Sequence, residues 1–352
     1  MDDGNHLDVK GGVVKDPFHI QWHITNLCDL RCKHCYQDNF SKGNDLNQSD
    51  LKKISDHLLT TISEWDQTAC IHLTGGEPLL KPELFPLLKE LDQKSSVEEL
   101  AVITNGLLLN QEVVNRFSSI SKLKKIKVSL DGSTPEINDS IRSSGTFKNV
   151  IKNITSIKKE NPFEFIMMFT VMRRNYNDLS NFIRLCEDLN VDGVIIERFI
   201  PLGRGKEIKN EVLSREEWGE MIGRLLDLFK ADLENLSLPT YQAFQIHFNG
   251  EDPVLLGAPC VIGVDGICIM PEGTVFPCRR FPISIGSLLE TPLKQIWEES
   301  EILETLRKKE NLKGKCRSCE MKDCRGCRSL ALALTGNYLE EDPYCRYPDL
   351  SY

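Results

Sequence analysis

Residues 19–36 read HIQWHITNLCDLRCKHCY and join a strand-like run to three closely spaced cysteines. The run 19–25 is rich in β-branched and aromatic residues, which favours a β-strand. Cys28, Cys32 and Cys35 follow on one short loop. We therefore expect a strand whose carboxyl end presents three thiols close together.

Between residues 18 and 230, similar strand-like runs alternate with amphipathic segments of helical period. This alternation is typical of β-α units around a parallel sheet. We expect six units, with strands at 19–25, 69–74, 101–104, 127–130, 165–171 and 193–199. Six units are too few to close an eight-unit barrel. The predicted fold class is therefore α/β, with a partial (β/α)6 barrel followed by a small cysteine-rich domain.

Turn motifs follow the next three predicted strands. Gly75-Gly76-Glu77-Pro78 follows the second strand, Asn105-Gly106 the third and Asp131-Gly132 the fourth. In parallel β-α folds, ligands gather at the carboxyl ends of the strands. We therefore expect these turns to share one site with the cysteine loop.

The segments between the strands carry apolar stripes that a helix would turn toward the sheet. Two such stripes are Leu51, Ile54, Leu58 and Ile62, and Leu179, Phe182, Ile183 and Cys186. Ser214 and Glu217 have the spacing of a capping box, which predicts the start of the last helix of this region.

Composition limits the classes of function. The chain has 352 residues, 40% of them hydrophobic and 27% charged, which is typical of a globular protein of one or two domains. No apolar run is long enough to span a bilayer, and the first residues lack the features of a signal peptide, so we expect a cytoplasmic protein that binds no membrane. The net charge of -9 disfavours nucleic acid as a partner.

Cysteine usage points to metal. A cytoplasmic chain keeps its thiols reduced and rarely needs thirteen of them for packing. Three lie within residues 28–35 and eight within 260–345. The two others, Cys70 and Cys186, fall on apolar runs, where packing is the favoured interpretation and hydrogen donation to a substrate the less favoured one.

Three thiolates on one short loop can wrap a single four-iron, four-sulfur cluster. Three ligands leave one iron open, and an open iron can chelate a ligand with an amine and a carboxylate. The alternative is a zinc site completed by His34. His34 lies between two of the cysteines and would have to fold back onto the same ion, which weakens that alternative.

The cysteine spacing with Tyr36 directly after it, followed by Thr74-Gly75-Gly76-Glu77-Pro78, resembles the radical S-adenosylmethionine superfamily over roughly residues 17–205. The resemblance implies that an electron from the cluster cleaves the bound cofactor to a 5′-deoxyadenosyl radical. It also implies that the Gly-Gly-Glu-Pro turn meets the methionine amino group and that Arg142 grips the methionine carboxylate. The cofactor-binding residues so implied are Tyr36, Gly75, Gly76, Glu77, Asn105, Ser129, Asp131 and Arg142.

Taken singly, most of these residues also fit ordinary turns or solvated charges. Their order and their places after strands favour the cofactor site. The tract 198–205 also resembles the sixth strand end of this family, but a loop with solvated arginines explains it equally well.

Near residue 258 the sequence composition changes, and Cys, Gly and Pro become closely spaced. One helix is expected beyond this point, over 288–309. We predict an N-terminal tail at 1–16, the barrel at 17–230, a linker at 231–258 and a cysteine-rich domain at 259–352. The eight cysteines of that domain resemble the SPASM extension of radical enzymes that modify peptides, with two auxiliary clusters. The resemblance assigns Cys260, Cys268, Cys278 and Cys327 to one cluster, and Cys316, Cys319, Cys324 and Cys345 to the other.

Two gaps among these cysteines are each one residue shorter than the SPASM pattern, which leaves the partition open. Structural zinc is the competing interpretation of the two Cys-x2-Cys pairs. Only four residues separate the pairs, whereas zinc ribbons use fifteen or more, so iron–sulfur clusters are favoured.

The leading functional hypothesis is a maturase that abstracts hydrogen from a peptide or protein substrate. The short segment before the first strand leaves no room for an N-terminal peptide-recognition domain. Arg279 stands where sulfatase-maturing relatives have Asp, which argues against that reaction. Reduced ferredoxin or flavodoxin is the expected electron donor.

The alternative enzyme acts on a tetrapyrrole in a haem pathway, by side-chain decarboxylation or a similar step. Its basis is the tail Ala333-Leu-Thr-Gly-Asn-Tyr with Glu341-Asp-Pro-Tyr-Cys345, which resembles haem-pathway enzymes of the same superfamily. The non-enzymatic alternative is a zinc-stabilised interaction protein.

Overall fold

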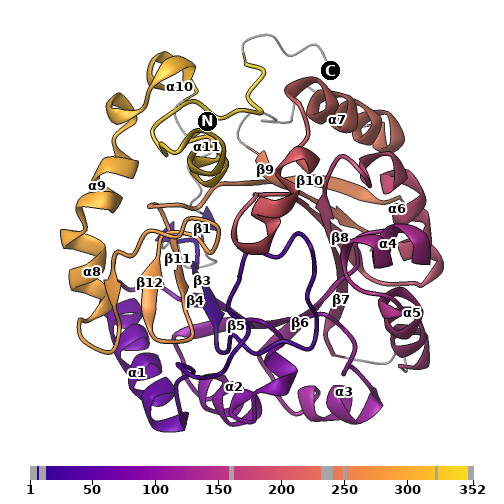
Figure 1. The fold of residues 1–352 in the computed structure, drawn as a ribbon. Coiled ribbons are helices and arrows are strands. Elements are labelled where there is room, and N and C mark those ends of the chain that lie inside the picture. Colours follow the sequence, from indigo (N-terminus) through magenta and orange to yellow (C-terminus); the bar gives the residue numbers. More distant parts are fainter. Residues whose placement is uncertain are drawn as a thin grey trace.

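A computed structural model describes residues 6–7, 13–157, 162–230, 241–248, 250, 252–321 and 324–347. Its main sheet has eleven described strands in the order β10-β9-β8-β7-β6-β5-β4-β3-β11-β12-β13. The six central strands are β3 (Phe18–His23), β4 (Ala69–Thr74), β5 (Val97–Thr104), β6 (Leu123–Ser129), β7 (Glu164–Val171) and β8 (Gly193–Arg198). They pair in parallel and in chain order. All six strands predicted from the sequence are confirmed, and they curve into the open ring of Figure 1.

Helices and short 3-10 turns connect the strands. They are α1 (Gln48–Glu64), η1 (Pro78–Leu80), α2 (Leu84–Asp92), α3 (Gln111–Phe117), α4 (Pro135–Ile141), α5 (Thr146–Ser156), η2 (Tyr176–Asp178), α6 (Leu179–Asp188), η3 (Gly203–Glu211) and α7 (Arg215–Phe229). Asn47 caps α1 by accepting bonds from the backbone N–H groups of Ser49 and Asp50. The capping box of Ser214 and Glu217 begins α7, as predicted.

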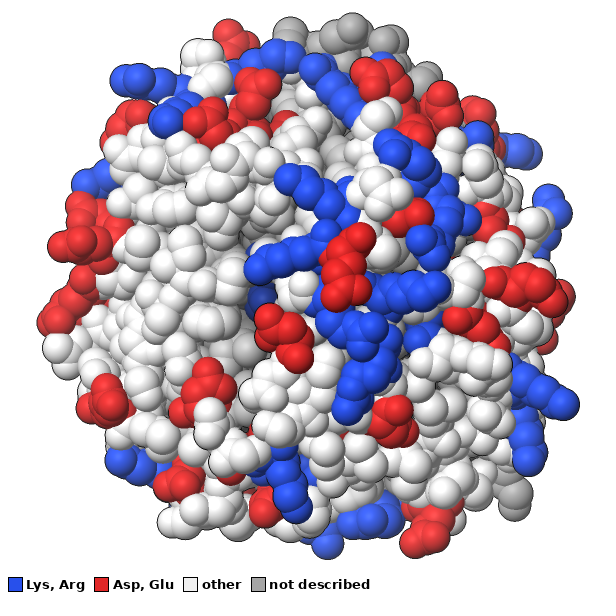
Figure 2. All heavy atoms as spheres, in the orientation of Figure 1, with Lys and Arg blue, Asp and Glu red and all other residues white. Residues whose placement is uncertain are grey.

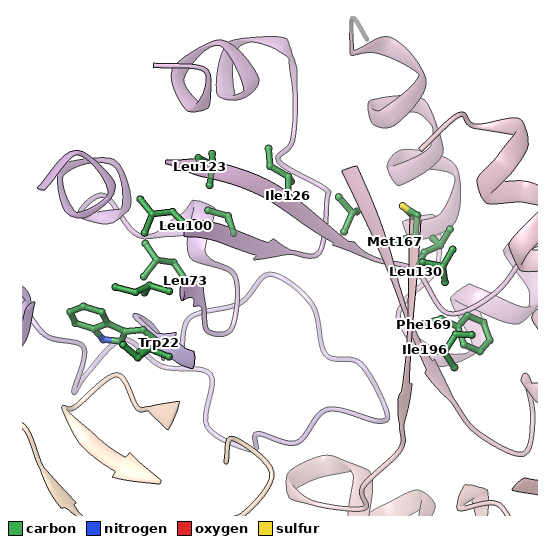
Figure 3. Close-up of a cluster of buried hydrophobic side chains, with 14 of the residues drawn as sticks. Trp22, Leu73, Leu100, Leu123, Ile126, Leu130, Met167, Phe169 and Ile196 are labelled. Carbon is green, nitrogen blue, oxygen red and sulfur yellow. The ribbon is translucent and has the colours of Figure 1, made fainter. Parts of the chain in front are cut away.

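The core lies between the sheet and these helices. Both predicted helical stripes are buried, on α1 and on α6. Trp22, Leu73, Leu100 and Ile126 come from four neighbouring strands and form one apolar layer with no exposed surface (Figure 3). Burying such a side chain stabilises the fold by about 1.5–3 kcal/mol. The ring is therefore a rigid support for the loops at its carboxyl edge.

The segment 231–258, predicted as a linker, contains two strands. β9 (Tyr241–His247) pairs antiparallel with β8, and β10 (Val254–Pro259) pairs antiparallel with β9. Residues 231–240, 249 and 251 of this segment lie outside the described residues. The two strands therefore extend the sheet beyond the sixth parallel strand, where the sequence indicated only a connection.

The C-terminal region continues the other edge of the sheet. β11 (Gly266–Ile269) pairs in parallel with β3, and β12 (Thr274–Phe276) and β13 (Gly286–Ser287) follow antiparallel. The remaining elements are α8 (Leu293–Glu299), α9 (Glu301–Arg307), η6 (Lys309–Asn311), α10 (Gly314–Ser318) and α11 (Arg328–Thr335), with a small hairpin of β1 (His6–Leu7) and β2 (Val13–Val14) near the N-terminus.

The single helix expected over 288–309 is two helices. Ser300 has the extended backbone angles φ -71° and ψ 113°, and its side chain caps α9 by accepting a bond from the N–H of Leu303. A serine that caps one helix cannot continue the previous one, so the chain breaks there.

No helix among the described residues is long and apolar enough to cross a bilayer.

Candidate functional site

Cys28, Cys32 and Cys35 line one cavity at the carboxyl edge of the sheet. Their loop follows β3 and lies across the middle of the ring in Figure 1. Thr74, Gly75, Gly76, Thr104, Asn105 and Ser129, from the ends of β4, β5 and β6 or the turns after them, line the same cavity. The structure therefore brings together the cysteine loop and the three turns that the sequence placed after neighbouring strands.

Hydrogen bonds hold the start of the cysteine loop. The hydroxyl of Thr25 donates to Asp45, whose other carboxylate oxygen accepts from the N–H of Asn26 at 3.0 Å. The N–H of Leu27 donates to the Thr25 hydroxyl oxygen at 3.0 Å. Further along, the N–H of Lys33 donates to the carbonyl of Ile141 at 2.9 Å. These bonds fix the direction in which the three thiols leave the strand end.

The thiols of the loop resist ionisation. Burial raises the pKa of Cys28 to about 12 and that of Cys35 to about 11. Burial also raises the pKa of Cys32, against an opposing effect of the Arg142 guanidinium. Thiolates bind metal, so a cationic group must displace these protons and stabilise the charge. Three buried thiols around one cavity have the donor chemistry that an iron–sulfur cluster requires.

Gly75 and Gly76 allow β4 to approach the cysteine loop closely. Gly75 has φ +151°, and a Cβ added to it would lie 2.3 Å from the carbonyl oxygen of Thr25. A Cβ on Gly76 would lie 2.3 Å from the carbonyl oxygen of Leu27. The N–H of Gly76 donates to the Thr25 carbonyl at 2.8 Å. No other residue fits both positions, so the glycines are required for this wall of the cavity.

Glu77 lies behind that wall, with no exposed surface. Its carboxylate accepts bonds from the N–H groups of Asn105 at 2.7 Å and Leu79 at 3.0 Å, and from the Thr104 hydroxyl at 2.8 Å. Burial raises the pKa of Glu77 to about 7, although these donors oppose the shift. The side chain therefore joins the ends of β4 and β5.

Asp131 also lies behind the cavity and positions two side chains that line it. Its Oδ2 is 2.7 Å from Nε of Arg142 and 3.4 Å from Nε2 of His34, while its Oδ1 accepts from the N–H of Thr170. Asp131 therefore holds the His34 ring from behind the cavity. Burial lowers the pKa of His34 to about 4, so the ring is neutral at pH 7.

Of the eight predicted cofactor-binding residues, six line the cavity and two support it. The six are Tyr36, Gly75, Gly76, Asn105, Ser129 and Arg142. Glu77 and Asp131 are the two supporting carboxylates. The roles of all eight toward a cofactor stay predictions.

The eight C-terminal cysteines form two groups. Cys316, Cys319, Cys324 and Cys345 line a second cavity. In the other group, burial raises the pKa of Cys260 to about 12, and nearby Cys327 and Cys278 add to the shift. Burial also raises the pKa of Cys268, and Cys278 again adds to it. These are the same two groups that the SPASM resemblance implies, and each has the four thiols of a fully ligated cluster. Their role as ligands stays a prediction.

The tract 198–205, which the sequence left undecided, packs on the cysteine loop. The N–H of Gly205 donates to the carbonyl of Cys35 at 3.0 Å. A Cβ on Gly203, which has φ +52°, would lie 2.4 Å from the carbonyl of Tyr36. The tract therefore covers the end of the loop, and its two glycines allow the contact.

Sequence reasoning missed a buried ion pair between the barrel and the tail. Nη1 of Arg198 lies 2.8 Å from Oδ2 of Asp342, and the two side chains are 4% and 3% exposed. The same carboxylate accepts from the N–H groups of Cys327 and Tyr344. The pair places two predicted cluster ligands, Cys327 and Cys345, relative to the end of β8.

The cavity of the cysteine loop is lined by more arginines than carboxylates. Arg142, Arg198, Arg279 and Arg280 line it, against the single carboxylate of Glu197 among its described lining residues. Lys and Arg side chains also gather near the middle of the same face in Figure 2. Such a cavity attracts anionic groups.

Two family models match the chain. The Radical SAM superfamily matches residues 22–186, and SPASM, an iron-sulfur cluster-binding domain, matches residues 260–320. These matches contradict the zinc-stabilised interaction protein, because they identify an enzyme superfamily and a cluster-binding domain.

Several known proteins are similar over almost the whole chain. An AdoMet-dependent heme synthase of Methanosarcina barkeri is 31% identical over 93% of this chain and 96% of its own length. The mycofactocin maturase MftC of Mycobacterium ulcerans is 27% identical over 94% of this chain and 88% of its own. The crystal structure of Streptococcus suis SuiB bound to its precursor peptide SuiA has a TM-score of 0.71 at 16% identity, and covers 94% of this chain and 76% of SuiB.

Proposed function

Because the chain belongs to the radical S-adenosylmethionine superfamily and carries a SPASM iron–sulfur domain, we propose that it oxidises a carboxylate-bearing side chain of a tetrapyrrole. Its relatives include both haem synthases and peptide maturases, so the enzyme class is established and the substrate is the proposal. The barrel, the cysteine loop and the two C-terminal cysteine groups supply the parts that this chemistry needs.

When bound, the cluster at the cysteine loop supplies the electron that cleaves S-adenosylmethionine to a hydrogen-abstracting 5′-deoxyadenosyl radical. Cys28, Cys32 and Cys35 would hold it, and the open backbone beside Gly76 would receive the methionine amino group. Arg142 would bind the methionine carboxylate, because Asp131 fixes one edge of its guanidinium and the rest lines the cavity. The two C-terminal cysteine groups would hold the auxiliary clusters.

The observation that carries the tetrapyrrole substrate is the 31% identity with a heme synthase across nearly the full length of both chains. The basic cavity agrees with it, since tetrapyrroles of haem pathways carry carboxylate side chains. A decarboxylation there balances if one hydrogen atom leaves with the 5′-deoxyadenosyl radical, one electron leaves to an auxiliary cluster and the side chain loses carbon dioxide to become an alkene.

A peptide or protein maturase is the second candidate. The similarity to MftC over 94% of this chain favours it, and SuiB shows that this fold can bind a precursor peptide. The basic cavity would then receive an acidic residue of the peptide.

The electron donor that we propose is reduced ferredoxin or flavodoxin, in the cytoplasm. A reducing compartment agrees with thirteen cysteines, none of the described ones disulfide-bonded.

The two candidates are separated by giving the anaerobically reconstituted enzyme either a propionate-bearing porphyrin or acidic precursor peptides. We expect 5′-deoxyadenosine formation to rise with the porphyrin, and mass spectrometry to find a product lighter by one carbon dioxide and two hydrogens per reacted side chain. Modification of a peptide, with an unchanged porphyrin, would instead establish the maturase.

A further inference from the structure

Arg279 lies where the barrel, the cysteine loop and the C-terminal domain meet. It follows Cys278 and lines the cavity of the cysteine loop. Its guanidinium forms an ion pair with Glu197 on β8, and its Cζ is 5.5 Å from the centre of the Tyr36 ring. The guanidinium therefore stands between a predicted cofactor residue and a predicted ligand of an auxiliary cluster.

The other three arginines of the cavity are held by groups that do not line it, or by the backbone. Arg142 pairs with Asp131, Arg198 pairs with Asp342, and Arg280 donates to the carbonyl of Arg198 at 2.8 Å. Asp131 and Asp342 are both buried. Arg279 differs from Arg142 and Arg198, because Glu197, its ion-pair partner, is itself part of the cavity wall, where Arg280 and Lys127 also attract it.

The guanidinium of Arg279 also keeps unused donors. It contacts Glu197 through Nη2 alone, and within the described part of the chain its Nε and Nη1 make no hydrogen bond. A guanidinium has five N–H donors in a planar fork that fits a carboxylate bidentately. An incoming carboxylate could therefore bind Arg279 beside Glu197 or in its place.

We propose that Arg279 binds a carboxylate of the substrate, and that Glu197 holds its guanidinium in the cavity and competes with that carboxylate. The assignment rests on the tetrapyrrole function proposed above and predicts how the substrate is oriented in the cavity. The anionic end of the substrate lies toward Cys278, and the radical forms on the side of Tyr36 and the cysteine loop. Arg279 is then a specificity-determining residue of this chain.

Substitutions of Arg279 and Glu197 should change the affinity for a carboxylate in opposite directions. Arg279→Met removes the donors and weakens binding of a carboxylate. Glu197→Gln removes the competing carboxylate and strengthens it. Arg279→Lys keeps the charge but loses the fork, so it should lie between the wild type and the methionine variant.

The test uses the anaerobic holoenzyme and two probes, coproporphyrin and its neutral carboxamide analogue, with binding followed by quenching of porphyrin fluorescence. S-adenosylmethionine binding is measured on the same samples. The matched control is Arg224→Met on α7, whose side chain is 47% exposed on the outer surface.

We expect Arg279→Met to weaken coproporphyrin binding by about tenfold to a hundredfold, the loss typical of a hydrogen bond to a charged group. We expect Glu197→Gln to strengthen it by about twofold to fivefold, because the neutral amide no longer competes for the guanidinium. Binding of the carboxamide and of S-adenosylmethionine should not change, and Arg224→Met should behave as the wild type.

Equal losses for the two porphyrins, or weaker S-adenosylmethionine binding by Arg279→Met, would overturn the carboxylate site while leaving the tetrapyrrole function standing. Weaker coproporphyrin binding by Glu197→Gln would overturn the competing role of that residue. If the wild type binds neither porphyrin, the proposed function fails, and the site fails with it.

Discussion

Replacing Arg198 by methionine removes the cation from an ion pair in which both side chains are almost fully buried, at 4% and 3% exposure. Asp342 would keep the backbone donors of Cys327 and Tyr344 but lose the Arg198 guanidinium, whose Nη1 lies 2.8 Å from its Oδ2. Removing one partner of a buried pair costs about 3–5 kcal/mol, because the other charge stays buried. The contact of the guanidinium with the Trp218 ring, 4.6 Å away, is lost as well.

The assay is guanidinium chloride unfolding of the anaerobic holoenzyme, followed by far-UV circular dichroism. The control is Arg173→Met, which breaks an ion pair with Glu217 whose side chains are 47% and 24% exposed, and which should cost about 0–1 kcal/mol. The double variant Arg198→Met, Asp342→Asn should recover part of the loss, because no uncompensated charge remains.

The pH dependence has a definite sign. Burial raises the pKa of Asp342, but Arg198 and two backbone donors overcome this and hold it below its usual value of 3.8. The pair therefore stabilises the fold above about pH 4, and its contribution is lost as the pH falls through the lowered pKa. The difference between wild type and Arg198→Met should shrink in acid. A loss below 1 kcal/mol at pH 7, equal to that of Arg173→Met, would refute the reasoning.

Three further changes test other parts of the site. Gly76→Ala places a Cβ 2.3 Å from a backbone carbonyl and should abolish S-adenosylmethionine binding in a calorimetric titration, whereas Gly43→Ala, which meets only a side chain at 3.8 Å, should bind normally. Since the pKa of Glu77 is raised to about 7, unfolding free energy should fall as pH rises from about 4.5 to 7; Glu77→Gln should flatten this slope in thermal unfolding, and equal slopes would contradict the assignment. Arg328, 1% exposed, donates to the sulfur of Cys316 at 3.5 Å. Arg328→Met should lower the reduction potential of an auxiliary cluster, by roughly 60 mV for each 1.4 kcal/mol by which the reduced state loses stabilisation. The potential is measured by a redox titration followed by electron paramagnetic resonance, and an unchanged potential would exclude this role.

The parallel strands were predictable because their signal is local. Each of the six is a short apolar or β-branched run that ends in a turn, and each cavity motif stands directly after one of them. The cysteine spacing predicted, in the same way, the loop whose three thiols line the cavity. Glu77 and Asp131 were found by motif, but their buried supporting contacts depend on donors from other strands and could not be seen in the sequence.

What the sequence missed depends on distant pairing. β9 and β10 extend the edge of β8, and the alternation of Phe244, Ile246 and Phe248 is the local signal that could have indicated β9. β11 pairs with β3 from the opposite end of the chain. The ion pair of Arg198 and Asp342 joins residues 144 apart, and no local pattern indicates such a contact.

The proposed cluster on the N-terminal loop, with one open iron, is tested most directly by replacing Cys28, Cys32 and Cys35 together with alanine. After anaerobic reconstitution, the wild type should contain about twelve irons per chain and the variant about eight, as expected for one lost four-iron cluster out of three. With dithionite, only the wild type should form 5′-deoxyadenosine from S-adenosylmethionine. Undiminished 5′-deoxyadenosine formation by the variant, or a single zinc on the wild-type loop, would contradict the assignment.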